Sequence, residues 1–164
     1  MAETSTESTG IAGGGDRLWG TKVGDDLAFL LARANALSLA RVNAALADFD
    51  IKIRHYSVLA IAATDARPSQ RELSEFLQLD PSQIVSLVDY LEKRGLVTRE
   101  PDPRDRRANV VVATPQGKQL AEQARDAVKV SEDHWFSILP QEDAERLGSI
   151  LRTLAGSNDL ATTR

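Results

Sequence analysis

The chain has 164 residues, a net charge of −4 and no cysteine. Its length suits one globular domain with additional helices, and the lack of cysteine excludes disulfide frameworks, thiol catalysis and thiolate metal sites. No apolar run is long enough to span a membrane, and the N-terminus has no basic region followed by an apolar stretch. We therefore expect a soluble cytoplasmic protein with no membrane partner.

The charge is unevenly distributed along the chain. Residues 52–118 contain eleven basic and nine acidic residues, whereas the segments on either side are neutral or acidic. Four arginines fall between Arg99 and Arg107. Because a local basic patch can bind phosphates even in an acidic protein, the net charge does not exclude a nucleic-acid partner.

The first part of the chain combines a tail with two predicted helices. Gly, Ser and Thr dominate the first 15 residues, which favours a mobile tail over residues 1–24, and we expect a second tail over residues 157–164. Apolar residues at helical spacing predict one helix from Asp25 to Asp48 and another from Arg54 to Ala63.

Residues 69–95 have the pattern of a helix-turn-helix. Ser69 and Glu72 form a capping box at the start of a short helix. Asp80 as N-cap and Pro81 at the first helical position start the next helix, which ends at Gly95. That second helix buries one apolar face and leaves a polar, mostly uncharged face outward, as DNA-reading helices do. The buried positions are Ile84, Leu87, Val88 and Leu91.

A β-hairpin is predicted after the second helix. The segments 96–100 and 108–113 are rich in β-branched residues, and two prolines between them disfavour regular pairing at the tip. Arg104, Arg106 and Arg107 lie in that connection, where phosphates could neutralise them. Asp105 between them is predicted to shape the turn by accepting backbone or arginine hydrogen bonds.

The C-terminal part predicts two further helices. A long helix runs from Thr114 to about Leu139, Pro140 breaks it, and residues 141–155 form a helix with an acidic first turn. The apolar faces at the two ends of the chain are too extended for a lobe of this size to cover. We therefore predict that residues 25–51 and 115–156 form dimerisation helices.

The segment LEKRGLVTREPDPRDRRANVVVATPQG resembles the winged-helix core of the MarR (multiple antibiotic resistance regulator) family of bacterial transcription factors. The match is specific over residues 102–107 and at Thr114 and Gly117, while Ala113 stands where the family usually has leucine. The resemblance implies a mainly α fold with a small β-hairpin: a winged helix-turn-helix over residues 52–114, flanked by the dimerisation helices. It also implies a homodimer on a pseudo-palindromic DNA operator.

The resemblance assigns roles by position. Residues on the second helix would face bases in the major groove, Arg106 would be the wing-tip residue in the minor groove, and the start of the Ser69 helix would approach phosphates. Arg71 and Lys93 are further phosphate candidates. The predicted DNA-binding residues are Ser69, Arg71, Ser82, Gln83, Ser86, Lys93, Arg104, Arg106 and Arg107.

The resemblance also implies control by a small aromatic or phenolic effector. Trp19, His55 and Tyr56 are the candidates, because an aromatic acid could stack on them and accept a hydrogen bond from His55. The alternative is that Trp19 and Tyr56 only pack and that His55 caps a helix or lies on the surface. An effector would act by changing the separation of the paired recognition helices from one DNA turn, about 34 Å.

The sequence also bears on two other classes of function, an enzyme and a protein-binding module. An enzyme is not predicted: there are only two histidines, His55 and His134, with no glycine-rich phosphate loop and no HExxH spacing, so neither a cofactor nor a metal site is expected. The second class is a winged-helix module that binds another protein through its arginines and does not bind specific DNA. The salt dependence of DNA binding separates that alternative from a DNA regulator.

Overall fold

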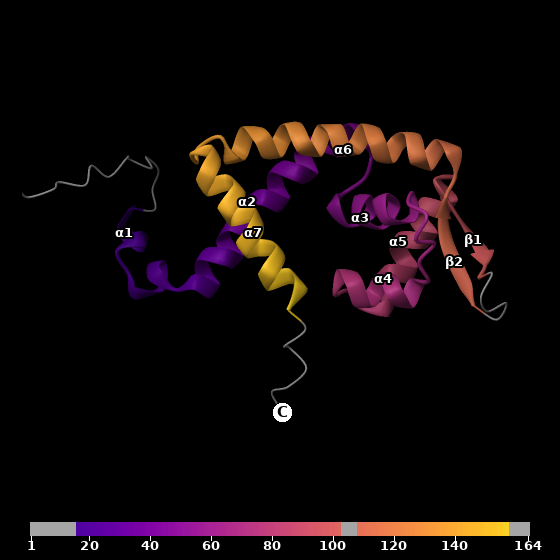
Figure 1. The fold of residues 1–164 in the computed structure, drawn as a ribbon, viewed down its shortest axis with the longest axis horizontal. Helices are drawn as coiled ribbons and strands as arrows, with labels where there is room; N and C mark the ends of the chain where they lie inside the picture. The colour runs from indigo at the N-terminus through magenta and orange to yellow at the C-terminus, as the bar shows by residue number, and fades with distance from the viewer. Residues whose placement is uncertain (1–15, 103–107, 158–164) are drawn as a thin grey trace, which may run out of the picture. The chain divides into compact units, whose positions relative to one another are not determined.

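The structure is a computed structural model that describes residues 16–102 and 108–157 (Figure 1). The predicted wing-tip residues Arg104, Asp105, Arg106 and Arg107 lie outside the described residues. The chain forms two compact units that divide after Ser38.

The N-terminal unit contains two short helical segments that the sequence did not predict. Helix α1 (Asp16–Trp19) and the 3-10 helix η1 (Lys22–Asp25) lie where a tail was expected, and α2 (Leu27–Ala45) begins after them. The Trp19 and Phe29 rings meet edge to face with centroids 6.3 Å apart, and the Arg33 guanidinium lies 5.1 Å from the Trp19 ring centroid. Contacts with α2 therefore hold the segment around Trp19.

The end of α2 corrects the predicted helix, which extended to Asp48. The α-helix ends at Ala45, and a 3-10 helix η2 (Ala47–Phe49) follows. Asp50 then adopts a left-handed conformation with φ 52°. Its carbonyl oxygen accepts hydrogen bonds from the Tyr90 hydroxyl at 2.6 Å and from Arg94 Nη1 at 2.9 Å. These partners lie about 40 residues away in sequence, so the local apolar pattern could not reveal the turn.

The helix-turn-helix forms as predicted, from α4 (Gln70–Leu77) and α5 (Pro81–Lys93), and α3 (Ile53–Ala62) precedes it. The capping box of α4 is confirmed: Ser69 Oγ accepts from the Glu72 amide at 3.2 Å, and the Glu72 carboxylate accepts from the Ser69 amide at 2.7 Å. Asp80 caps α5, and Gly95 after it has a φ of 69°.

The hairpin pairs β1 (Val97–Pro101) with β2 (Asn109–Ala113) in antiparallel register, Val97 opposite Ala113. Pro101 corrects one expectation, because it ends β1 opposite Asn109 and is not excluded from the pairing. A proline is tolerated there because β1 is an edge strand of this two-stranded sheet. On the other edge, the Val111 amide donates to the Pro68 carbonyl at 2.8 Å, which fixes the segment before α4 against the hairpin.

Helix α6 (Pro115–Phe136) packs on α3 and joins two apolar clusters, and α7 (Gln141–Gly156) follows it (Figure 1). The larger cluster lies inside the winged helix-turn-helix, and the smaller one joins α6 to the end of α2. Leu120 and Tyr90 border both clusters. The smaller cluster contains Val42, Leu46, Ile51, Ala124 and Val128. Side chains of α6 therefore connect the helix-turn-helix to the segment that begins at Leu39.

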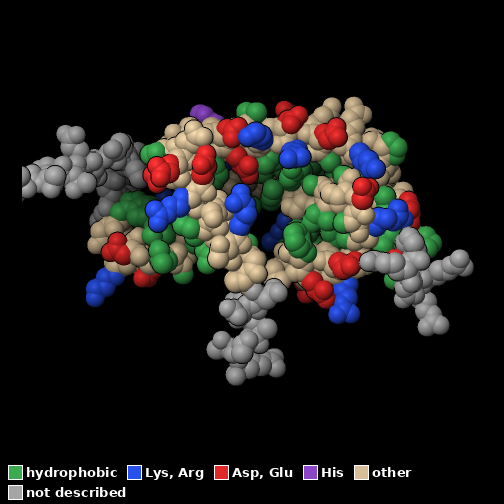
Figure 2. Space-filling view, viewed as in Figure 1, with side chains coloured by type: hydrophobic (Ala, Val, Ile, Leu, Met, Phe, Trp, Pro, Cys, Tyr) green, Lys and Arg blue, Asp and Glu red, His purple; other side chains and the backbone are tan. Residues whose placement is uncertain are grey.

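The exposed side chains of α6 and α7 include charged residues on α6 and a group of apolar residues on α7. Acidic and basic side chains are interspersed along α6 in the view of Figure 2. On α7, Ile150, Leu151 and Leu154 are exposed apolar residues. In the part of the chain that the structure describes, no helix is both long and apolar enough to span a membrane.

Candidate nucleic-acid interface

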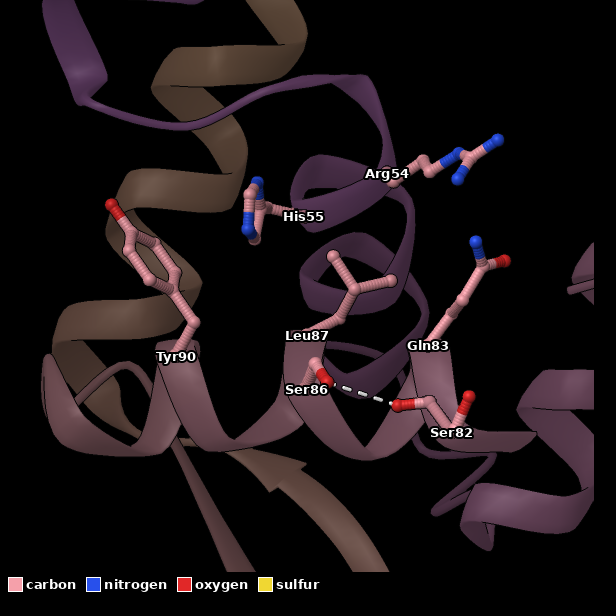
Figure 3. A pocket seen from close by; sticks show the side chains of 7 residues that line it. All are labelled: Arg54, His55, Ser82, Gln83, Ser86, Leu87 and Tyr90. Atoms are coloured by element: carbon pink, nitrogen blue, oxygen red, sulfur yellow. Dashed lines mark hydrogen bonds between the residues drawn. The ribbon is translucent and has the colours of Figure 1, made fainter. Parts of the chain in front are cut away.

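The outer face of α5 presents hydroxyl groups whose hydrogens are used within the helix. Ser82 Oγ donates to Asp80 Oδ1 at 2.5 Å, and Ser86 Oγ donates to the Ser82 carbonyl at 3.0 Å (Figure 3). The hydrogen bond from the Ser82 side chain, and then that from its backbone, lowers the pKa of the Asp80 carboxyl. Both hydroxyls are exposed and keep free lone pairs, so they can accept hydrogen bonds from base amino groups.

Gln83 lies on the flank of α5 that faces α3. Its exposed side chain has no hydrogen bond within residues 16–102 and 108–157. It borders an open hollow of about 410 Å³ together with Arg54 and His55 (Figure 3). A free carboxamide at this position suits bidentate pairing with an adenine edge. Lys93, predicted as a phosphate contact, is exposed in the last turn of the same helix.

The opposite flank of α5 contains a residue that the sequence analysis missed. Val85 is 42% exposed and borders a hollow of about 420 Å³ between α4 and α5. Pro81 lies beside it, so α5 lines this hollow with apolar residues, while the α4 residues that line it are polar: Gln70, Arg71, Ser74 and Glu75. An exposed valine on a DNA-reading helix can contact a thymine methyl group. The sequence pattern assigned Val85 neither to the buried face, which was predicted as Ile84, Leu87, Val88 and Leu91, nor to the polar outer face.

The start of α4 holds two predicted phosphate contacts that already have partners. The Ser69 hydroxyl is used in the capping box. Arg71 Nε lies 2.8 Å from Glu75 Oε1, and this hydrogen bond raises the pKa of the Arg71 guanidinium. Because the pair is fully exposed, water and phosphate compete for both groups.

Arg99 on β1 forms an ion cluster that the sequence analysis did not predict. Its guanidinium contacts Asp89 at 2.5 Å and also Glu92, both on α5, and its Nε donates to Gln70 Oε1 on α4 at 2.8 Å. One side chain thus connects β1 to both helices of the helix-turn-helix. The strand pattern predicted where Arg99 lies, but not which carboxylates its side chain reaches.

His55 caps α3, as the structural alternative for this residue predicted. Its Nδ1 accepts a hydrogen bond from the Lys52 amide at 3.2 Å, so a neutral ring carries its hydrogen on Nε2. The ring packs against Tyr90 with the ring centroids 4.5 Å apart and the ring planes tilted by 42° (Figure 3). Burial lowers the pKa of His55, and the charges of Lys52 and Arg94 lower it further, while Asp50 opposes them.

The lowered pKa of His55 predicts a loss of stability in mild acid. The unfolded chain binds a proton at His55 near pH 6.5, whereas the folded chain binds it only at lower pH. The stabilisation is therefore present above pH 6.5 and is lost as the pH falls below it. Between pH 7.5 and 5.5, the free energy of unfolding measured in urea should fall less for His55→Asn than for the wild type. The amide oxygen of the new side chain can still accept the hydrogen bond from the Lys52 amide. His134→Asn is the control, and an equal loss in all three proteins would contradict the prediction.

The other two effector candidates do not share the hollow of His55. Tyr56 packs against the cluster beside α6, where burial raises the pKa of its phenol despite the opposing charge of Arg125. Trp19 belongs to the N-terminal unit, where it borders a separate apolar pocket of about 250 Å³. The observed contacts of Trp19 and Tyr56 are thus packing contacts, as the alternative to effector binding describes.

Sequence comparison finds relatives among transcriptional regulators. The MarR family model matches residues 49–108. A Thauera aromatica protein, named for transcriptional regulation of the hcr operon, is 34% identical over 91 residues. That alignment covers 56% of this chain and 54% of the relative, so the chain spans about half the length of that protein.

Three solved structures are similar over most of the chain. A MarR family transcriptional regulator from Rhodococcus sp. RHA1 has 37% identity and a TM-score of 0.74, covering 81% of this chain and 96% of its own. CouR from Rhodococcus jostii RHA1, bound to p-coumaroyl-CoA, has 34% identity and a TM-score of 0.74, covering 83% and 96%. A transcriptional repressor CouR bound to a 23-mer DNA duplex has 26% identity and a TM-score of 0.77, covering 84% and 96%.

Proposed function

The chain belongs to the MarR family of transcriptional regulators, and we propose that it is a ligand-responsive repressor that binds a pseudo-palindromic operator as a homodimer. Each α5 would enter a major groove, and each wing, with Arg106 at its tip, would enter the flanking minor groove. As a DNA-binding regulator it would act in the cytoplasm.

The outer face of α5 is the observation that carries this proposal. Ser82 and Ser86 offer acceptors, Gln83 offers a free carboxamide, and Val85 offers an apolar contact, all on one helix of suitable width. The hairpin is fixed to this helix through Arg99. The similar CouR structure with a bound DNA duplex supports the same use of the fold.

The proposed homodimer is supported by the apolar surface of the C-terminal helices. Ile150, Leu151 and Leu154 are spaced along one side of α7 and are exposed in the single chain. An apolar stripe of this kind is typical of a helix that packs on a partner. Two-fold symmetry would also place two copies of α5 on adjacent major grooves.

The proposed effector is a small aromatic or phenolic compound. The CouR structure with p-coumaroyl-CoA shows that a protein of this fold holds an aromatic acyl ligand. In this chain, His55 offers an Nε2–H donor beside the hollow at α5, while Trp19 and Tyr56 would act only through other surfaces. Titration of the DNA complex with aromatic acids should lower its affinity. Unchanged affinity with every compound would contradict the effector proposal.

Selection of bound sequences from a random DNA library tests the DNA-binding proposal. We expect a two-fold motif with half-sites about one helical turn apart. Gln83→Ala should change the preferred base at one position of each half-site. A bidentate contact of this kind discriminates against the wrong base by about 1–3 kcal/mol. Arg106→Ala should instead weaken binding to all sequences. Gln123→Ala, on the exposed side of α6, is the matched control.

The salt dependence separates this function from a protein-binding module. With several phosphate contacts per subunit, DNA affinity should fall by orders of magnitude between about 50 and 200 mM salt. A library without an enriched motif, together with weak salt dependence, would favour the protein-binding alternative.

A further inference from the structure

Arg54 lies beside the DNA-reading helix, but neither the sequence pattern nor the resemblance assigned it a role. It is an exposed residue in the first turn of α3. Its guanidinium and the Gln83 carboxamide, from two different helices, extend to the same side of the hollow (Figure 3). The phosphates that border a helix in the major groove would lie on such a flank.

Arg54 differs from the other described arginines of this lobe because its guanidinium has no partner among the described residues. Arg67, Arg71 and Arg99 each pair with carboxylates, and Arg94 donates to the backbone carbonyls of Phe49 and Asp50. Arg54 has no hydrogen bond or ion pair within the described residues.

The two flanks of α5 also differ in charge. The hollow on the α3 side has no carboxylate in its lining, whereas Glu75 lines the hollow on the α4 side and pairs there with Arg71. His55, which lines the first hollow, is neutral at pH 7 because burial lowers its pKa. Arg54 therefore provides a positive charge in the lining of the hollow on the α3 side, and that lining contains no carboxylate.

We propose that Arg54 binds a backbone phosphate of the operator and so fixes the depth and register of α5 in the major groove, with Gln83 held against base edges. This inference rests on the proposed DNA-binding function. A helix about 10–12 Å wide fills a groove of about 12 Å, so phosphates border it on both sides. A guanidinium can bind such a phosphate with two parallel hydrogen bonds, and this contact is independent of the base sequence.

The first test compares the salt dependence of operator binding among charge variants. The slope of log K against log [salt] should become shallower by about 1 per half-site for Arg54→Ala. Arg54→Lys should keep the wild-type slope because it keeps the charge. Arg125→Ala removes the same charge from α6, beside Tyr56 on the other side of α3, and should leave the slope unchanged.

The second test neutralises single phosphates of the duplex selected by the wild-type protein. Replacing one phosphate per half-site with a methylphosphonate should lower the affinity of the wild-type protein for the duplex about tenfold. The same replacement should not lower the affinity of Arg54→Ala further. If the wild-type protein binds the selected duplex and Arg54→Ala keeps its slope, the Arg54 inference is wrong while the DNA-binding function stands. If the wild-type protein binds no duplex, both are wrong.

Discussion

Gly117→Ala is expected to destabilise the protein by about 3–5 kcal/mol and to lower its melting temperature by about 10 °C. Gly117 is buried in the first turn of α6, where the chain passes from β2 into the helix. A Cβ added at this position would lie 1.9 Å from the Leu96 carbonyl oxygen and 2.8 Å from its carbonyl carbon. Backbone atoms cannot move aside as a flexible side chain can, so the junction would have to open.

Hydrogen bonds fix the same junction from several directions. The Gly117 amide donates to Thr114 Oγ1 at 3.0 Å, and Thr114 Oγ1 donates to the Gly95 carbonyl at 2.7 Å. The Thr114 amide donates to the Leu96 carbonyl at 3.0 Å, the group that the new methyl would displace. The substitution would therefore break a hydrogen bond as well as create a steric clash.

Gly148→Ala is the matched control in a helix of the same chain. A Cβ at Gly148 in α7 would meet only the end of the Arg152 side chain, at 3.9 Å. Since alanine is favoured over glycine in a helix by about 1 kcal/mol, this variant should be slightly more stable than the wild type. Thermal and urea unfolding measure both variants. A Gly117→Ala protein as stable as the wild type would show that the close approach to Leu96 is absent.

The sequence predicted those parts of the fold that local interactions determine. The capping box of Ser69 and Glu72, the start of α5 at Asp80 and its end at Gly95 each depend on residues within about four positions. The end of α2 was predicted wrongly because Tyr90 and Arg94 determine it from another helix. Helical periodicity contains no information about such distant partners.

The same limit applies to the candidate site: the local sequence pattern predicts some of its residues, and packing between separate helices places the others. Periodicity placed Ser82 and Ser86 on the outer face of α5, because burial of Leu87 and Leu91 determines which face is free. It could not identify Arg54, since only the packing of α3 against α5 brings that residue beside Gln83. Single-helix patterns therefore predict the face that reads DNA, but not the flanks supplied by neighbouring elements.

Arg99→Ala is expected to weaken operator binding by about tenfold at low salt. The substitution leaves Asp89 and Glu92 on α5 without the shared guanidinium that offsets one of their two negative charges. Both carboxylates are at least 40% exposed, on a helix that would approach DNA phosphates, so they would repel the operator. The net charge of the cluster falls from −1 to −2, and a tenfold loss for one uncompensated carboxylate, about 1.4 kcal/mol, gives the expected magnitude.

Loss of the Arg99 guanidinium also removes the connection from β1 to Gln70 on α4, so affinity could fall because the wing is displaced. A rescue variant separates this cause from charge repulsion. Adding Asp89→Asn and Glu92→Gln to Arg99→Ala removes the carboxylates without restoring the connection. If repulsion dominates, the triple variant should regain most of the wild-type affinity and its salt dependence. If the triple variant binds as weakly as Arg99→Ala alone, Arg99 acts by holding the wing against the helix-turn-helix.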